Sequence, residues 1–177
     1  LSMPNTDCRI VDIETGKDWA AGEEGELWIR GPQVMQGYLN NPEATATTIA
    51  EGGWLRTGDI AIIDADGYMY IVDRLKELIK YKGFQVAPAE LEATLVSHKS
   101  ISDAAVIGLP DDEAGELPIA FVVKTDDAFS EEDLHAFMNE TLSHYKQVHQ
   151  VHFVDSIPKS ASGKILRRLL RDQIAKN

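Results

Sequence analysis

The sequence predicts an α+β fold in two parts. A β-rich subdomain over residues 1–73 should precede a small α+β domain over residues 74–177, in which helices flank a central sheet. Segments that alternate apolar and polar residues, separated by turn sequences, dominate the first part. Continuous apolar runs, typical of strands buried on both faces, alternate with amphipathic helical patterns in the second part. The pattern changes near Asp73 and Arg74, which we take as the boundary between the parts.

The first part contains strand patterns, one helix start and a hairpin. Asn41 followed by Pro42 and an acidic residue is typical of a helix N-terminus, and this helix should run to about Ala50. The expected strands cover residues 8–13, 25–30, 60–63 and 68–72. Between the last two, Asp-Ala-Asp-Gly indicates a hairpin turn.

The second part alternates strands with amphipathic helices. Pro88 should open one helix, and Ser130 with Asp133 resembles a capping box that starts another. Apolar residues at helical spacing from Ile165 to Leu170 indicate a last helix. The expected strands cover residues 77–81, 104–107, 119–123 and 151–154.

The composition limits the classes of partner. The formal charge of −12 disfavours nonspecific nucleic-acid binding, because phosphates need cationic partners. Residues 158–177 differ from this acidic chain, because they carry six basic side chains and one acidic. This basic stretch predicts an anionic partner. No apolar run is long enough for a transmembrane helix. The single cysteine, Cys8, and the lack of a signal-peptide pattern predict a reducing, cytoplasmic location.

No metal site is expected. The five histidines are scattered without metal-ligand spacing, and no cysteine pair accompanies them. The sequence opens on Leu1 without an initiator methionine, so we expect a fragment or a trimmed segment of a longer protein.

The stretch Pro-Lys-Ser-Ala-Ser-Gly-Lys over residues 158–164 resembles an incomplete phosphate loop. A Walker loop would need glycine where Pro158 stands and a hydroxyl where Ile165 stands, so this is not one. Two readings of Lys164 remain from these residues: a lysine that stabilises developing charge on a phosphate or carboxylate, or a solvated surface lysine. The stretch alone favours the surface reading, because most lysines are solvated.

Two further motifs suit nucleotide binding. In Thr57-Gly58-Asp59 the carboxylate of Asp59 could accept hydrogen bonds from both hydroxyls of a ribose, or the motif could be a simple turn. Arg74 could bind a nucleotide through its guanidinium, or pair with an acid at a domain edge.

The order of the motifs is more specific than any one of them. Gly-Glu-Leu-Trp-Ile-Arg-Gly-Pro (25–32) runs on to Gly-Tyr-Leu-Asn (37–40), and Gly-Trp-Leu-Arg-Thr-Gly-Asp (53–59) follows. A long motif over residues 72–92 and the lysine stretch over 158–164 complete the series. The chain resembles the C-terminal part of the acyl-CoA synthetase, or adenylate-forming, superfamily, in its branch of 4-coumarate–CoA ligases and fatty-acyl-CoA ligases.

The resemblance implies an acid–thiol ligase and gives its residues roles. Such an enzyme forms an acyl-adenylate and pyrophosphate from a carboxylic acid and ATP, which carries Mg²⁺. Its small C-terminal domain then swings, and the thiol of coenzyme A displaces AMP. Asp59, Arg74 and Gln85 would bind the nucleotide, and Lys76 would be the hinge. Lys164 and Lys80 would be catalytic, and Lys82 and Gly83 would bind coenzyme A. On this basis Lys164 is expected to act in adenylation.

The family's Ser/Thr/Gly-rich phosphate loop, its Thr-Glu motif and most of its acyl pocket have no counterpart in this sequence. The chain alone is therefore expected to be inactive, and its first partner would be the N-terminal domain of the same enzyme. Three alternatives remain: an enzyme that loads a carrier protein, a luciferase-like oxidase, and a lid-like interaction module without chemistry.

Overall fold

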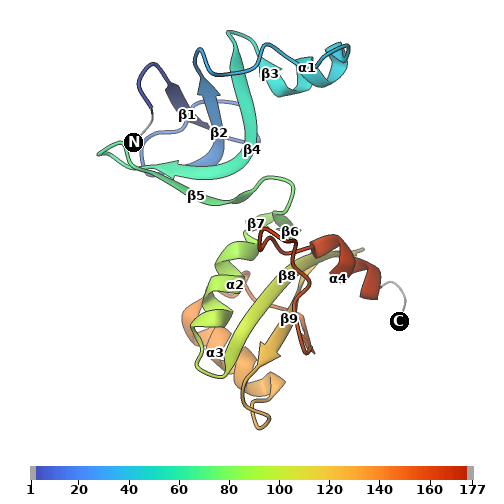
Figure 1. Cartoon of the computed structure of the whole chain (residues 1–177). Helices are drawn as coiled ribbons and strands as arrows, with labels where there is room; N and C mark the ends of the chain where they lie inside the picture. Colours follow the sequence, from blue (N-terminus) through green and yellow to red (C-terminus); the bar gives the residue numbers. More distant parts are fainter. Residues whose placement is uncertain (1–2, 175–177) are drawn as a thin grey trace. The chain divides into compact units, whose positions relative to one another are not determined.

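A computed structural model describes residues 3–174 as two compact units, the first ending at Lys76 and the second beginning at Glu77 (Figure 1). The sequence placed this boundary at Asp73–Arg74. The structure assigns Arg74 to the first unit because it ends a strand that pairs with that unit's sheet.

The first unit is an antiparallel sheet with one short helix. Its strands have the order β1-β2-β4-β3, and β5 pairs with β4. The elements are β1 (Asp7–Val11), β2 (Glu24–Arg30), α1 (Pro42–Thr48), β3 (Ile49–Ala50), β4 (Trp54–Ile63) and β5 (Met69–Arg74). The predicted hairpin is the β4–β5 pair.

The two faces of this sheet carry different side chains. Ile10, Leu27 and Ala61 form a small apolar core on one face. Neighbouring residues point to the other face. There the side chains of three strands form an alternating cation–π ladder, with guanidinium-to-ring distances of 4.3 to 4.9 Å. Its members, in order, are Arg56, Trp28, Arg9, Trp54 and Arg30.

Local sequence signals of the first unit are confirmed at the start of α1 and corrected at its end. The Asn41 side chain accepts a hydrogen bond from the Ala44 amide, as expected of an N-cap. The helix stops at Thr48 rather than Ala50, because Ile49 and Ala50 pair with β4. Strand β4 also begins earlier than predicted, at Trp54.

The second unit is a mixed sheet covered by helices. The order of strands is β10-β9-β6-β7, and β8 pairs with β9 along most of its length. Only the β9–β10 pair is parallel. The elements are β6 (Ile79–Tyr81), β7 (Phe84–Val86), α2 (Pro88–Ser97), β8 (Ile101–Asp111), β9 (Gly115–Lys124), α3 (Glu131–Thr141), β10 (Gln150–Phe153) and α4 (Arg167–Ile174).

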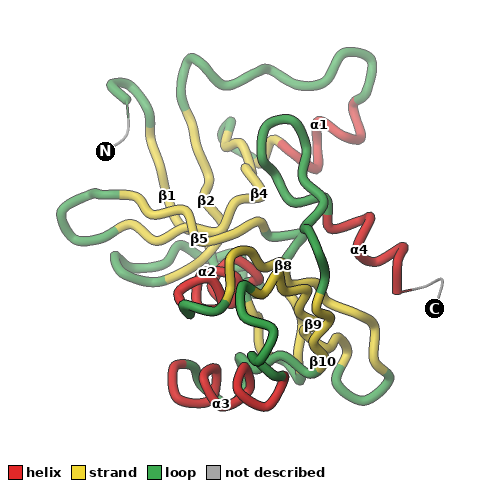
Figure 2. The backbone as a smooth tube through the Cα atoms, turned by 60° about the horizontal axis from the view of Figure 1, so that its bottom comes forward, coloured by secondary structure: helices red, strands yellow, loops and turns green. Residues whose placement is uncertain are grey.

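Helices cover both faces of this sheet, which explains the continuous apolar runs in β8 and β9. Val106 and Val122 face the core that α2 and α3 complete with Leu91 and Leu134. The intervening residues of both strands face the opposite side, where Leu170 of α4 packs. Figure 2 shows α2 and α3 on one side of β8 and β9, and α4 on the other. The predicted α+β class is confirmed.

The sequence located most of these elements, missed one strand and began the last helix too early. The capping box at the start of α3 is present, with Ser130 and Asp133 bonding each other's backbone amides. Strand β7 was not predicted, because three residues give no clear periodicity. The last helix begins at Arg167 rather than Ile165, since Ile165 forms a β-bridge with Lys159.

No helix within residues 3–174 combines the length and the apolar character needed to cross a membrane.

The core between the sheet and α2 should dominate the stability of the second unit. Leu91 of α2 is fully buried, whereas Val96 of the same helix is 44% exposed. We expect Leu91→Ala to lower the free energy of unfolding of the chain by about 2–5 kcal/mol, because it leaves a cavity. Val96→Ala should change it by less than about 0.5 kcal/mol. Urea unfolding followed by circular dichroism at 222 nm measures both, and equal effects would contradict this description of the core.

Candidate functional site

The first candidate site is the pair Asp59 and Arg74. The register of β4 and β5 puts these residues directly opposite each other, and Arg74 Nε lies 2.8 Å from Asp59 Oδ1. Their side chains are 28% and 65% exposed, so a ligand can reach both. A carboxylate has about four lone-pair sites, so Asp59 keeps acceptor capacity for vicinal hydroxyls while it pairs with Arg74. Both readings of Arg74 from the sequence thus remain compatible: it pairs with an acid and stays accessible.

A bulge in β4 fixes where Asp59 points. Gly58 adopts φ +69°, in the left-handed region that favours glycine, and the register of β2 against β4 shifts here. Nearly buried Glu26 accepts hydrogen bonds from the Gly58 amide at 3.0 Å and from the Trp28 indole at 2.8 Å. The Thr57 hydroxyl donates to the Leu27 carbonyl at 2.7 Å and accepts from the Asp59 amide. The motif is therefore an ordered bulge within the strand.

The second candidate site is the β6–β7 hairpin, which carries four of the predicted residues. Its two-residue loop is Lys82-Gly83, with φ +48° and +83°, as a type I′ turn requires. Lys80 and Gln85 lie opposite each other on the two strands. All four residues are exposed, and a Cβ placed on Gly83 would meet nothing within 4 Å. The hairpin therefore presents two lysines beside an open backbone.

Aromatic side chains of this hairpin pack against rings from the segment that precedes β10. Phe84 stacks on Tyr145 with ring centroids 4.4 Å apart, and Tyr81 contacts His149 at 4.9 Å. Desolvation lowers the pKa of His149 from its ordinary value, and the charge of Lys82 lowers it further. Both effects favour the neutral form of His149, whereas the two lysines of the hairpin carry positive charge.

The third candidate site is Lys164, at the end of a closed loop. The backbone before it forms a hydrogen-bonded turn. The Ser160 amide donates to the Lys164 carbonyl at 2.8 Å, and the Lys164 amide donates to the Ser160 hydroxyl at 3.1 Å. The bridge between Lys159 and Ile165 closes the loop, and Gly163 turns it at φ +80°.

The side chain of Lys164 is exposed and forms no ion pair with any residue in the described range 3–174. The basic residues around it are paired. Lys159 Nζ contacts Asp103 Oδ2 at 2.7 Å, and Arg167 contacts Glu92 at 2.8 Å. The loop thus offers one available ammonium on a fixed backbone.

The structure brings two groups of predicted residues together. Asp59 and Arg74 are in contact, and the four hairpin residues share one turn. Lys76 is the last residue of the first unit, which is where a hinge was predicted. Sequence reasoning missed the supporting residues Glu26 and Glu92. The one signal that could have indicated Glu26 is that it is an acidic residue inside a predicted strand.

Within residues 3–174 no group of three or more His, Cys, Asp or Glu side chains is placed to hold a metal ion.

Comparisons with known proteins agree with the motif order. The family model described as AMP-binding enzyme C-terminal domain matches residues 90–164, and the model described as AMP-binding enzyme matches residues 1–39. A 4-coumarate–CoA ligase of Pinus taeda is 56% identical over 171 residues, which are 97% of this chain and 32% of that protein. The 4-coumarate–CoA ligase-like 1 of Arabidopsis thaliana is 58% identical over 173 residues, with the same coverage.

The chain belongs to the AMP-binding enzyme family. Its fold agrees with solved structures of that family. MatB from Rhodopseudomonas palustris, solved with ATP bound, has a TM-score of 0.90 and 32% identity over 97% of this chain and 34% of that one. The o-succinylbenzoate CoA synthetase of Bacillus subtilis, solved with an acyl-adenylate intermediate, has a TM-score of 0.84 and 33% identity over 96% and 34%.

This AMP-binding family chain spans about a third of the length of the curated relatives that it matches. The family relationship predicted from the four motifs is confirmed. The individual roles of Asp59, Arg74, Lys76, Lys80, Lys82, Gly83, Gln85 and Lys164 stay predictions that the geometry described above accommodates.

The turn of the β6–β7 hairpin contains strain that a substitution can release. Lys82 has φ +48°, a conformation that costs an L-residue other than asparagine or aspartate about 1–2 kcal/mol. We expect Lys82→Asn to raise the free energy of unfolding by about 0.5–1 kcal/mol, since Asn-Gly suits a type I′ turn. Lys80→Asn, the same change in the extended strand, should not stabilise. Denaturant unfolding measures the free energy of unfolding of both variants. Equal changes in the two would mean that the turn is not strained.

Proposed function

We propose that this chain is the C-terminal part of an ATP-dependent carboxylate–CoA ligase. The ligase first forms an acyl-adenylate and then transfers the acyl group to coenzyme A. The observation that carries the proposal is the exposed ammonium of Lys164 on a closed loop, with no ion pair to residues 3–174, in a chain that also holds the Asp59–Arg74 pair. The identity of 56–58% with 4-coumarate–CoA ligases and their relatives supports it.

In the first half-reaction a carboxylate oxygen attacks the α-phosphorus of ATP, the bond from that phosphorus to the bridging oxygen breaks, and pyrophosphate leaves. Negative charge on the α-phosphate and on the attacking carboxylate must be stabilised together. A lysine that approaches this region during the reaction supplies that stabilisation, which is worth more once water is excluded. Lys164 has this role, and Asp59 with Arg74 holds the ribose of the nucleotide.

In the second half-reaction the thiol of coenzyme A attacks the acyl carbonyl, and AMP leaves with the bonding electrons. The β6–β7 hairpin suits this step. Its open backbone at Gly83 leaves room for the narrow pantetheine arm, and Lys80 and Lys82 provide positive charge for phosphate groups. Gln85 contacts the nucleotide from the same hairpin.

The Lys164 loop acts in the first half-reaction and the β6–β7 hairpin in the second. The second unit must therefore reorient between the two half-reactions. Lys76, the last residue of the first unit, is the pivot. The phosphate loop and the acyl pocket belong to the N-terminal part of the enzyme, so the chain by itself is inactive. We also propose a cytoplasmic enzyme, which agrees with a single, unpaired cysteine, Cys8.

The proposal is tested on the full-length enzyme that carries this chain, with 4-coumarate as the first acid because of the relatives' names. We expect Lys164→Ala to lower the rate of pyrophosphate release by about 10²–10³-fold, as for removal of one preorganised charge donor. Transfer from a preformed acyl-adenylate to coenzyme A should stay within about threefold of the wild type, because a group that acts only in the first transition state affects that step alone.

Arg168→Ala is the matched control, because Arg168 lies close to Lys164 in the sequence, is 84% exposed and has its ion-pair contact, with Asp172, at 4.0 Å. It should affect pyrophosphate release far less than Lys164→Ala does. Undiminished adenylation by Lys164→Ala would refute the assignment of Lys164. Absence of AMP formation by the wild type with any carboxylic acid would refute the proposed function.

A further inference from the structure

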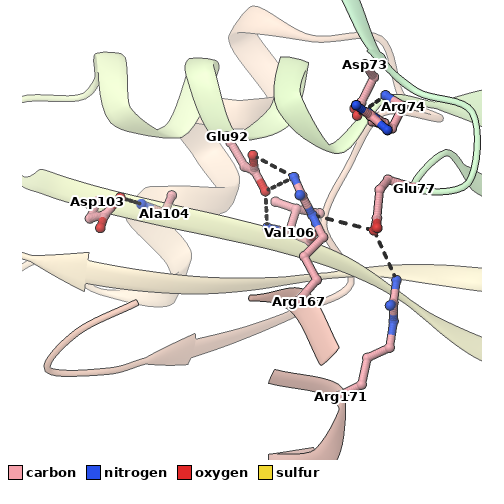
Figure 3. A network of polar contacts seen from close by, with 9 residues as sticks. All are labelled: Asp73, Arg74, Glu77, Glu92, Asp103, Ala104, Val106, Arg167 and Arg171. Atoms are coloured by element: carbon pink, nitrogen blue, oxygen red, sulfur yellow. Dashed lines mark hydrogen bonds and ion pairs between the residues drawn. The ribbon is translucent and has the colours of Figure 1, made fainter. Parts of the chain in front are cut away.

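We propose that Arg167, together with Glu92, is the positioning residue for Lys164, and that it acts by closing the open edge of strand β8. The inference rests on the proposed function of Lys164 in adenylation. Its evidence is a separate set of contacts, which lie behind the Lys164 loop (Figure 3).

Strand β8 has an edge that no other described strand covers. It pairs with β9 on one side only. Backbone groups on the opposite side need partners, because an unpaired buried amide or carbonyl is costly and an open edge invites wrong pairing. At Val106, which is fully buried, two side chains supply the partners. Glu92 Oε1 accepts from the Val106 amide at 2.8 Å, and Arg167 Nε donates to the Val106 carbonyl at 3.2 Å.

The same two side chains bind each other. Arg167 Nη2 donates to both carboxylate oxygens of Glu92, at 2.8 and 3.0 Å. Their side chains are only 16% and 13% exposed, so the charges are shielded from solvent and hold a defined geometry. We call Glu92, Val106 and Arg167 the edge clasp. It behaves like one residue of an additional strand, with an acceptor facing the amide and a donor facing the carbonyl.

The edge clasp links the two helical layers around the edge of the sheet. Glu92 comes from α2 on one face, and Arg167 opens α4 on the other. Glu77, the first residue of the second unit, extends the network. Its Oε2 lies 3.5 Å from Arg171 Nη2 and 3.9 Å from Arg167 Nε. Figure 3 shows Arg167 and Arg171 reaching from α4 toward these carboxylates. The helix that follows Lys164 is thereby held against β8.

The loop that carries Lys164 is tethered to β8 at both ends. Before the loop, Lys159 pairs with Asp103 of β8 at 2.7 Å. After it, Arg167 binds the carbonyl of Val106, three residues further along the same strand. Between the tethers, the Leu166 amide donates to the Pro158 carbonyl at 2.9 Å and closes the base of the loop. The backbone of Lys164 is thus fixed relative to the sheet.

This arrangement matters because charge stabilisation in a transition state depends on position. A lysine has a flexible stem, so its ammonium reaches one place reliably only if its backbone is held. Misplacement by about 1 Å from a distant change can cost about 10²-fold in rate. Arg167 does not contact the reacting atoms in this proposal. It determines the position of the Lys164 backbone, from which the side chain extends.

A positioning role and a merely structural role give different results. Loss of structure would lower both half-reactions equally, because both need the folded second unit. Loss of position should affect adenylation alone, since Lys164 acts in that step and the β6–β7 hairpin acts in the other. The half-reactions are therefore measured separately in the full-length enzyme: pyrophosphate release from ATP and 4-coumarate, and thioester formation from preformed acyl-adenylate and coenzyme A.

We expect Arg167→Ala to lower adenylation by about 10²-fold and thioester formation by less than about threefold. Arg167→Lys keeps the charge but lacks the planar fork, so it should restore adenylation only in part. The matched control is Arg168→Ala in the same helix. Arg168 is 84% exposed and has its ion-pair contact at 4.0 Å, with Asp172. It should leave both rates within about twofold, as a solvated surface pair contributes little.

Three outcomes would overturn the inference: equal loss in both half-reactions, no loss of adenylation, or an equal effect of Arg168→Ala. If the wild-type enzyme forms no adenylate, the proposed function fails, and amide hydrogen exchange of the 177-residue chain decides the inference alone. Arg167→Ala should then speed exchange at Ser160 and Lys164 without changing it at Ala120 in β9. Unchanged exchange at the loop would refute the positioning role.

Discussion

The organisation of the second unit depends on how the open edge of β8 is satisfied. Val106 lies in the middle of this strand, and its outward amide and carbonyl are bonded by Glu92 and Arg167. Because these side chains come from helices on opposite faces, one set of hydrogen bonds joins α2, β8 and α4. The position of the Lys164 loop follows from it, since the loop runs directly into α4.

The candidate residues are placed by backbone geometry more than by side-chain packing. The β4–β5 register puts Asp59 opposite Arg74, and the bulge at Gly58 orients the carboxylate. A two-residue turn presents Lys82 and Gly83, and a closed loop presents Lys164. Such presentation would suit the proposed enzyme, in which the second unit offers different groups to one reaction centre in turn, because each group then arrives with its geometry already set.

The sequence predicted what short-range chemistry determines. Asn41 and Ser130 marked helix starts because a cap needs only its neighbouring amides, and the apolar runs of β8 and β9 reflected two covered faces. It missed the edge clasp, because Glu92 and Arg167 are 75 residues apart and nothing local relates them. It also began the last helix too early, since the apolar spacing from Ile165 does not reveal that this residue bridges to Lys159. The family motifs assigned Lys164 a catalytic role, which stays a prediction, whereas single-residue chemistry favoured a surface role.

The central claim is that Glu92 and Arg167 act as one unit on the edge of β8. A double-mutant cycle with Glu92→Gln, Arg167→Gln and the double variant measures their coupling in the free energy of unfolding. The account predicts a coupling of at least about 1 kcal/mol, as expected for side chains within one shielded hydrogen-bond network. Effects that add within about 0.3–0.5 kcal/mol, the range for independent sites, would contradict it.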